Sequence, residues 1–159
     1  DDVNERFEYQ RANAIWEEVN TNMDRFEDMR DRNTNIQLQV CSTVNVFNVM
    51  YLEGLANWID KRSFDFVYWN MLHEARYHSV STLPESAKEV AIKNLKNANV
   101  TEYHRNEFNN IIDFIKAGTS LDGEDLRNNV KLVDWRRQQD LRTHHLELAN
   151  AIDYKGPSI

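Results

Sequence analysis

The stretch that decides the fold is Ile36-Gln37-Leu38-Gln39-Val40-Cys41-Ser42-Thr43-Val44-Asn45-Val46. Its first half alternates strictly between apolar and polar residues and its second half is rich in β-branched residues, a pattern typical of a β-strand. A helical pattern follows from Phe47 to Asp60, and a short aromatic and β-branched segment follows from Phe64 to Trp69. This order predicts a crossover unit in which strand 36–46 runs parallel to strand 64–68.

The segments beside this unit carry weaker patterns. From residue 12 to about residue 32, apolar residues recur at spacings of three and four, which predicts an amphipathic helix. The repeating positions are Ile15, Trp16, Val19, Met23, Phe26 and Met29. Residues 77–81 are a candidate third strand.

The second half of the chain reads as helical. Thr82-Leu83-Pro84-Glu85 combines a capping hydroxyl, an early proline and a later glutamate, which predicts a helix start. That helix is expected to run to about Asn97. A second is expected from Thr101 to Gly118, a third from Asp122 to roughly Gln139, and a short last one over 146–152. The sequence therefore predicts one α/β domain over 1–159, with β/α units in 1–82, a helical part in 83–152 and a tail in 153–159.

Composition excludes several classes of function. The net charge is 19 − 26 = −7 and the basic residues are scattered, so no nucleic-acid footprint is expected. Cys41 is the only cysteine, which excludes an internal disulfide and favours a reducing, cytoplasmic setting. No apolar run approaches the ~20 residues of a membrane span, so no membrane partner is expected. The polar start, without an initiating methionine, suggests a chain that begins inside something longer.

Local motifs for chemistry are missing. His73 and His78 are five residues apart, which points them apart on a helix and to opposite sides of a strand, so we expect no metal site. No serine sits in a nucleophile elbow, and the four glycines make no phosphate-binding loop. The sequence thus predicts no catalytic group in this chain. Cys41 reads as a small buried residue, and the tryptophans as core or interface residues.

Three stretches, in order, resemble the C-terminal part of twitch-type radical SAM proteins, a group frequent in bacteria and their large phages. The first is Arg6-Phe7-Glu8-Tyr9-Gln10-Arg11 with Trp16-Glu17-Glu18-Val19 and Asn22. The second is Cys41-Ser42-Thr43-Val44-Asn45-Val46-Phe47-Asn48-Val49. The third runs from Ser79-Val80-Ser81-Thr82-Leu83-Pro84 to Leu132-Val133-Asp134-Trp135-Arg136-Arg137-Gln138-Gln139-Asp140-Leu141 and ends at Leu146-Glu147-Leu148-Ala149. Family members usually have a proline before that last glutamate, and this chain does not.

The resemblance implies a partial, half β/α barrel with two to three mainly parallel strands and a helical C-terminal part. It also implies a full-length parent that binds S-adenosylmethionine and a 4Fe-4S cluster held by three cysteines. In the family those cysteines lie N-terminal to this region, and the single Cys41 cannot replace them. No cofactor is therefore expected to be held by this chain alone.

On the same resemblance, Arg11 faces the methionine carboxylate, and Thr43, Asn45 and Asn48 lie at the C-terminal end of the strand, where α/β proteins place ligand groups. The alternative for Asn45 and Asn48 is that they cap the following helix.

Three functions remain open on these grounds. The first is a C-terminal fragment or remnant of a radical SAM-like protein, the cofactor- and substrate-side half, not catalytic alone. The second is a non-catalytic binding or assembly protein that reuses the fold, and the third is an unrelated helical regulator without parallel strands. A narrow sheet leaves edges to cover, so we expect a homo-oligomer or association with the N-terminal half of a parent. Phe7, Tyr9, Phe66 and Trp69 are then expected to be partly exposed.

Overall fold

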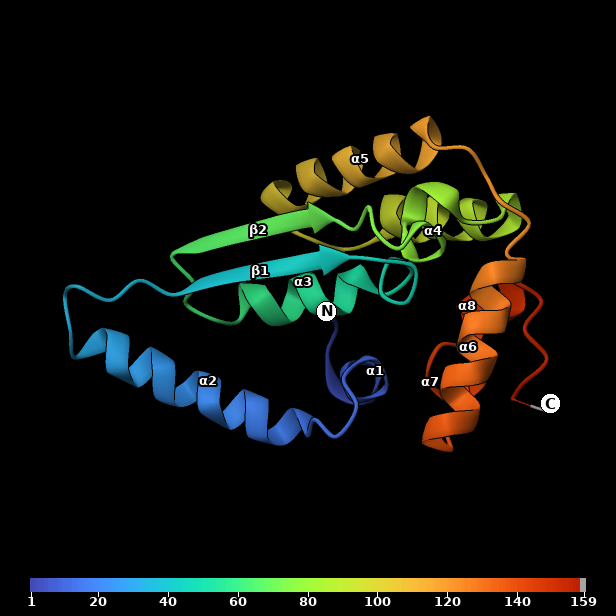
Figure 1. Cartoon of the computed structure of the whole chain (residues 1–159). Coiled ribbons are helices and arrows are strands. Elements are labelled where there is room, and N and C mark those ends of the chain that lie inside the picture. Colours follow the sequence, from blue (N-terminus) through green and yellow to red (C-terminus); the bar gives the residue numbers. More distant parts are fainter. Residues whose placement is uncertain (158–159) are drawn as a thin grey trace.

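The computed structural model describes residues 1–157 as a mixed α/β arrangement that is mostly helical (Figure 1). The elements are α1 (Asn4–Gln10), α2 (Trp16–Asp31), β1 (Gln39–Val44), α3 (Leu52–Asp60), β2 (Phe66–Met71), the 3-10 turns η1 (Arg76–His78) and η2 (Val80–Thr82), α4 (Glu85–Asn97), α5 (Glu102–Ala117), α6 (Glu124–Arg137), α7 (Leu141–His144) and α8 (Leu146–Ala151). No helix among the described residues is long and apolar enough to cross a membrane.

The two strands pair in parallel, with a register that runs from Gln39 opposite Phe66 to Val44 opposite Met71. The predicted parallel pairing across α3 is therefore confirmed. β1 is shorter than the predicted 36–46 because, at both of its ends, a backbone N–H donates to a side chain instead of to the neighbouring strand. Asp65 accepts from the N–H of Leu38 at 2.7 Å, and Asn48 accepts from the N–H of Asn45 at 2.9 Å.

The predicted third strand at 77–81 is wrong, because this segment forms η1 and η2. Its hydrogen bonds are local: the Thr82 hydroxyl donates to the carbonyls of Arg76 and Ser79 at 2.6 and 3.0 Å. The hydroxyl is thus occupied and does not cap α4, which begins at Glu85 with Pro84 at its N-cap. The His78 carbonyl accepts from the N–H of Val46, which attaches the turn to the end of β1.

Helices cover one face of the sheet only. Ser42, Val44 and Trp69 point to the covered face and are buried. The opposite, open face carries Gln39, Cys41, Thr43, Phe66, Tyr68 and Asn70, of which all but the half-buried Thr43 are exposed. Cys41 is therefore not the buried residue that the sequence suggested. Phe66 is 42% exposed as expected, whereas Tyr9 and Trp69 are buried, contrary to expectation.

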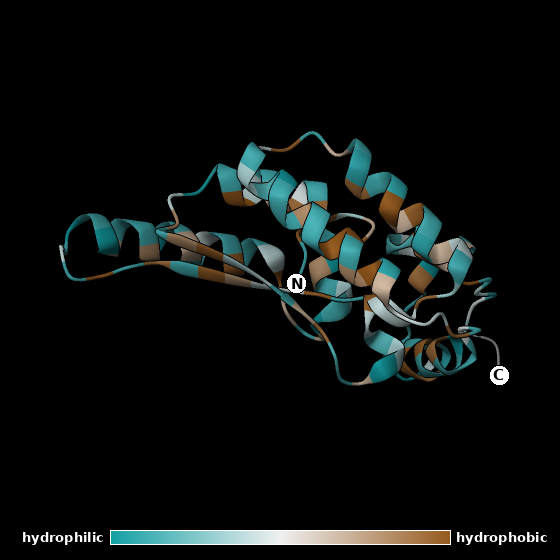
Figure 2. Ribbon diagram, turned by 90° about the horizontal axis from the view of Figure 1, so that it is seen from above, coloured by the Kyte–Doolittle hydropathy of each residue, from teal (hydrophilic) through white to brown (hydrophobic). Residues whose placement is uncertain are grey.

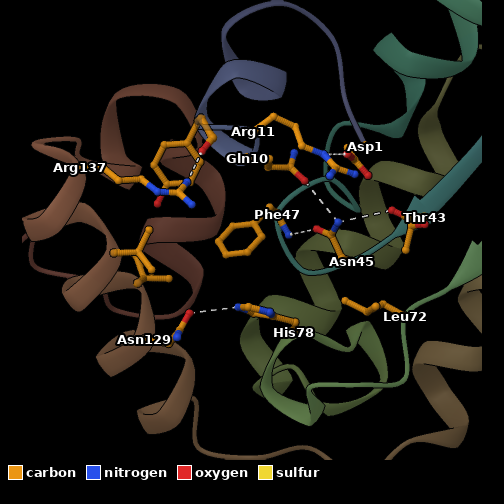
Figure 3. Close-up of a pocket in the computed structure, with 13 residues that line it drawn as sticks. Asp1, Gln10, Arg11, Thr43, Asn45, Phe47, Leu72, His78, Asn129 and Arg137 are labelled. Atoms are coloured by element: carbon orange, nitrogen blue, oxygen red, sulfur yellow. Dashed lines mark hydrogen bonds and ion pairs between the residues drawn. The ribbon is translucent and has the colours of Figure 1, made fainter. Parts of the chain in front are cut away.

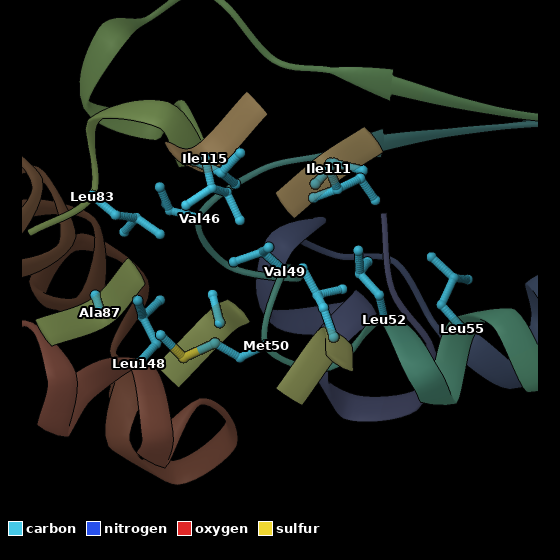
Figure 4. Packing of buried hydrophobic residues seen from close by; sticks show 14 of the residues in the cluster. Val46, Val49, Met50, Leu52, Leu55, Leu83, Ala87, Ile111, Ile115 and Leu148 are labelled. Carbon is cyan, nitrogen blue, oxygen red and sulfur yellow. The ribbon is translucent and has the colours of Figure 1, made fainter. Parts of the chain in front are cut away.

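The hydrophobic core lies between the covered face, α3, α4 and α5 (Figure 4). α5 contributes Phe108, Ile111, Ile112 and Ile115, all buried and spaced as one helical stripe. The facing side of α4 is lined by small residues such as Ala87 and Ala91. Their small size lets α4 and α5 approach closely. Figure 2 shows that hydrophobic and hydrophilic residues alternate along the helices, as expected where one side of a helix faces the core.

Gly118 ends α5 for a steric reason. A Cβ at this position would lie 2.1 Å from the carbonyl oxygen of Ser81, so η2 and the end of α5 can meet only at a glycine. The buried amine of Lys88 donates to the Gly118 carbonyl at 2.8 Å and satisfies the helix end. The contact fixes the 79–82 segment against α5.

The C-terminal helices attach to the N-terminal segment through the buried carboxylate of Asp134. It accepts from the Tyr9 hydroxyl on α1 and from the Tyr154 hydroxyl, both at 2.8 Å, and from the N–H of Leu141 at 2.7 Å. Burial, reinforced by this carboxylate, holds the pKa of Tyr9 and the pKa of Tyr154 above the ordinary value. Both phenols therefore keep the protons that they donate.

Two helices depart from the sequence pattern at the N-terminus. α1 was not predicted, and the helix expected over 12–32 is α2, over 16–31. α2 packs against the rest of the protein through Trp16, whose ring contacts the rings of Phe7 and Trp58, each at a centroid distance of 5.3 Å. Its outer turns leave Phe26 and Met29 half exposed.

His145 generates a prediction about pH. Its side chain is fully buried among the rings of Tyr9, Phe47 and Tyr51. Within residues 1–157, neither nitrogen of the His145 ring has a hydrogen-bond partner. Burial, with a smaller effect of Arg6 and His144, lowers its pKa to about 3. Between pH 6.5 and 3 the unfolded chain binds a proton that the folded chain does not, so stability falls as the pH falls. We expect a loss of about 3 kcal/mol between pH 7 and 4.

Urea unfolding at each pH measures this loss. His145→Phe keeps the ring volume and removes the titration, so its stability should depend less on pH over that range. His73→Gln, a change at an exposed histidine, should keep the wild-type slope. An unchanged slope in His145→Phe would show that other groups set the pH dependence.

Candidate functional site

A cavity of about 440 Å³ opens at the C-terminal end of β1 (Figure 3). Its walls come from the end of α1, the end of β1, the residues after β2 and one side of α6. The lining residues are Asp1, Tyr9, Gln10, Arg11, Thr43, Asn45, Phe47, Leu72, His78, Asn129, Val130, Val133 and Arg137. Elements far apart in the sequence therefore build one site at the position where parallel α/β sheets bind ligands.

The turn after β1 forms the first wall. The Asn45 side chain accepts from the N–H of Phe47 at 2.8 Å and donates to the Gln10 side chain at 3.3 Å and to the Thr43 carbonyl at 3.4 Å. These bonds fix the Asn45 amide at the cavity surface and turn the Phe47 ring inward (Figure 3). The wall thus offers an amide and an aromatic face to a ligand.

Asn48 lies behind this wall. It is fully buried, and its amide donates to the Thr43 carbonyl at 2.8 Å and to the carbonyl of Asp1. Its oxygen accepts from the N–H of Asn45, and α3 begins only at Leu52. Of the four residues expected at the ligand, Arg11, Thr43 and Asn45 line the cavity, whereas Asn48 shapes the turn. Neither asparagine caps the following helix.

Arg11 lies at the rim and pairs with the carboxylate of Asp1. The Arg11 side chain is 61% exposed, so solvent screens this pair. The contact shows that a carboxylate can reach the guanidinium from the cavity side. A ligand carboxylate would compete with Asp1 for the same donors.

The second wall is the inner side of α6, which the sequence did not point to. Asn129, Val130, Val133 and Arg137 follow one helical face. In the sequence, Val130 and Val133 are ordinary apolar helix positions, and Arg137 reads as part of a solvated helix end. No local pattern places them opposite β1, because tertiary contacts such as that of Tyr9 with Asp134 bring α6 to this place.

His78 joins the two walls. Its Nε2 lies 3.2 Å from the Asn129 side-chain oxygen, and its ring packs edge-on against Phe47 at a centroid distance of 5.3 Å. Burial lowers the pKa of His78, and the hydrogen bond to Asn129 opposes this effect only in part. The imidazole is therefore neutral at pH 7, and it donates to Asn129 if its Nε2 carries the proton.

Metal-binding groups do not gather here. Within residues 1–157, no three His, Cys, Asp or Glu side chains are placed to hold one ion. Cys41 lies on the open face of the sheet, against the Asn70 amide, and does not line the cavity. The lining residues suit an organic ligand with polar ends rather than a metal ion.

The chain matches no family model, no curated protein and no solved structure.

The different positions of Asn48 and Thr43 lead to a prediction. Asn48→Ala removes one buried and two partly buried hydrogen bonds, leaves the Asn45 N–H without its acceptor and leaves the Thr43 carbonyl with only the longer bond from Asn45, which should cost about 2–4 kcal/mol of unfolding free energy. Thr43→Val keeps the shape of a half-buried side chain at the cavity surface and should change stability by about 0.5 kcal/mol or less. Urea unfolding of both variants tests this, and equal losses would contradict the assignment of Asn48 to the turn.

Proposed function

We propose that this chain is the ligand-side, C-terminal half of a radical SAM-like protein and that the cavity at the end of β1 binds S-adenosylmethionine. The observation that carries the proposal is the meeting of Arg11, Thr43 and Asn45 at one cavity. These are three of the four residues that the resemblance places at the ligand, and the fourth, Asn48, lies behind the cavity wall. Proteins of this class need a partial β/α barrel, and the parallel β1-α3-β2 unit is consistent with one.

The chemistry of the cavity fits this ligand. Its volume falls within the range of ~300–1,000 Å³ that small-molecule sites occupy. Arg11 can bind the amino-acid carboxylate in place of Asp1. The Phe47 ring offers an apolar face to a nucleobase, and the amides of Asn45 and Gln10 can hydrogen bond polar edges of the ligand.

The 4Fe-4S cluster of such a protein has no site among residues 1–157, where Cys41 is the only thiol. In a full-length parent the cluster would supply the electron that cleaves S-adenosylmethionine. The residues described here bind and orient the cofactor, and no catalytic step is assigned to them. The presence of a three-cysteine run upstream in the parent gene would test this division directly.

Isothermal titration with S-adenosylmethionine tests the binding proposal on the chain as it stands. Arg11→Gln removes the charged donor pair and should weaken binding about tenfold, because one charge-assisted pair contributes ~1.5–3 kcal/mol. Arg25→Gln changes an exposed arginine of α2 and should leave the affinity unchanged. Asp1→Asn removes the competing carboxylate and should tighten binding.

The cofactor assignment would be overturned if S-adenosylmethionine at millimolar concentration gave no heat of binding and displaced no other ligand from the cavity. Equal losses in Arg11→Gln and Arg25→Gln would show a non-specific charge effect. Circular dichroism of each variant checks that the fold is retained.

A second candidate is an assembly protein that uses the open sheet face. Phe66 and Tyr68 are 42% and 48% exposed there, and their rings stack at a centroid distance of 6.4 Å. Parallel sheets are normally covered on both faces, so this face is an unusual surface for a protein to leave bare. We propose a second copy of the chain as its cover. An unrelated helical regulator would lack parallel strands, and β1 and β2 are parallel.

Light scattering on a sizing column tests the second candidate. The wild type should have the mass of a dimer at micromolar concentration, and the double change Phe66→Ser with Tyr68→Ser should give a monomer. Trp135→Ser removes an equally exposed aromatic on α6 and should leave the dimer intact. A monomeric wild type would rule out this self-association.

A further inference from the structure

The cavity gathers positive charge in an acidic protein. The chain carries a net charge of −7, yet the charged groups that line this cavity are two guanidinium groups, Arg11 and Arg137, and the carboxylate of Asp1. Another depression in the surface, beside α2, is lined by the charged residues Glu17, Glu18 and Arg25 and shows the opposite balance of charge. The site therefore favours anionic groups, and it has one more arginine than a single carboxylate needs.

Arg137 differs from Arg11 in its partners. Its Nη1 donates to the carbonyl oxygen of Tyr9 at 3.2 Å, and no carboxylate of residues 1–157 forms an ion pair with it. The carboxylate of Asp134, one turn earlier on α6, accepts hydrogen bonds from Tyr9, Tyr154 and Leu141 instead. The Tyr9 contact holds the guanidinium at the mouth of the cavity and leaves its remaining N–H groups free to bind an anion.

The surface around Arg137 is apolar. Val133 and Val130 lie one and two turns before it on α6 and line the cavity together with Tyr9, and the Phe47 ring lies across from α6 (Figure 3). The neutral His78 and its partner Asn129 offer one polar contact at the far end of this strip. This arrangement suits a ligand with a flat or apolar body and an anionic end.

We propose that the α6 side of the cavity is a second subsite, in which Arg137 binds the carboxylate or phosphate of an organic anion whose apolar body lies against Val130 and Val133. This inference rests on the proposed function, because it assigns the first subsite, at Arg11, to the cofactor and this one to the substrate. Arg137 is a binding residue for the substrate anion. The substrate class is then a small organic acid or phosphate ester with a ring or apolar body.

Titration followed by ¹H–¹⁵N spectra of the arginine Nε–H groups and asparagine side-chain amides tests the subsite. The probes are benzoate and phenyl phosphate, with acetate and inorganic phosphate as small counterparts. We expect saturable shifts at Arg137 and Asn129, with tighter binding of the two ring-bearing anions. The tighter of these two identifies the carboxylate or the phosphate as the natural group.

Variants separate a built site from general charge attraction. Arg137→Gln should weaken the binding of the ring-bearing anions about tenfold. Arg137→Lys keeps the charge but loses the paired guanidinium donors, so its affinity for these anions should lie between that of Arg137→Gln and that of the wild type. Arg136→Gln is the matched control, because Arg136 is exposed, as Arg137 is, but does not line the cavity. Equal losses in Arg137→Gln and Arg136→Gln, or shifts spread over all arginines, would overturn the subsite.

The same spectra keep the two proposals apart. If the anions bind through Arg137 and S-adenosylmethionine does not bind, the subsite stands as an anion site and the cofactor assignment fails. If S-adenosylmethionine binds and Arg137→Gln leaves every anion affinity unchanged, only the subsite fails.

Discussion

The buried carboxylate of Asp134 is the constraint on which the site depends. It accepts hydrogen bonds from α1, from the start of α7 and from the tail residue Tyr154. α6 itself has few apolar residues to hold it, since only Leu126 and Val130 among its hydrophobic residues are buried. A hydrogen bond to a charged group contributes ~1.5–3 kcal/mol, so the three bonds to Asp134 hold α6 in place together with its short apolar stripe.

The Tyr9–Asp134 contact also explains how two distant segments share one cavity. Tyr9 reaches Asp134 with its hydroxyl, and its carbonyl oxygen accepts from Arg137 one turn later on α6. The two contacts align α1 with α6 over about one helical turn. The cavity is the space that this alignment leaves between α6 and the end of β1, with the ring of Tyr9 in its wall.

The sequence predicted those features that depend on local patterns. Alternation from Ile36 and a crossover of adequate length were enough to give the parallel pair, and the general position of ligands at strand ends led to Thr43 and Asn45. It failed where tertiary contacts decide. Residues 77–81 have strand-like composition, but the Thr82 hydroxyl and the contact of Ser81 with Gly118 fold them into turns. Arg137 looks like a solvated helix end until Asp134 places α6.

The open sheet face and the cavity are physically linked, whichever function holds. Thr43 lies on the open face of β1 and also lines the cavity, so any protein that covers this face closes one side of the ligand site. A cover made by a second copy of the chain would reduce the exposure of a bound ligand to water. By thermodynamic reciprocity, a ligand that binds better under the cover must strengthen the association by the same factor. Through Thr43, the bare face of β1 and β2 is thus continuous with the wall of the cavity.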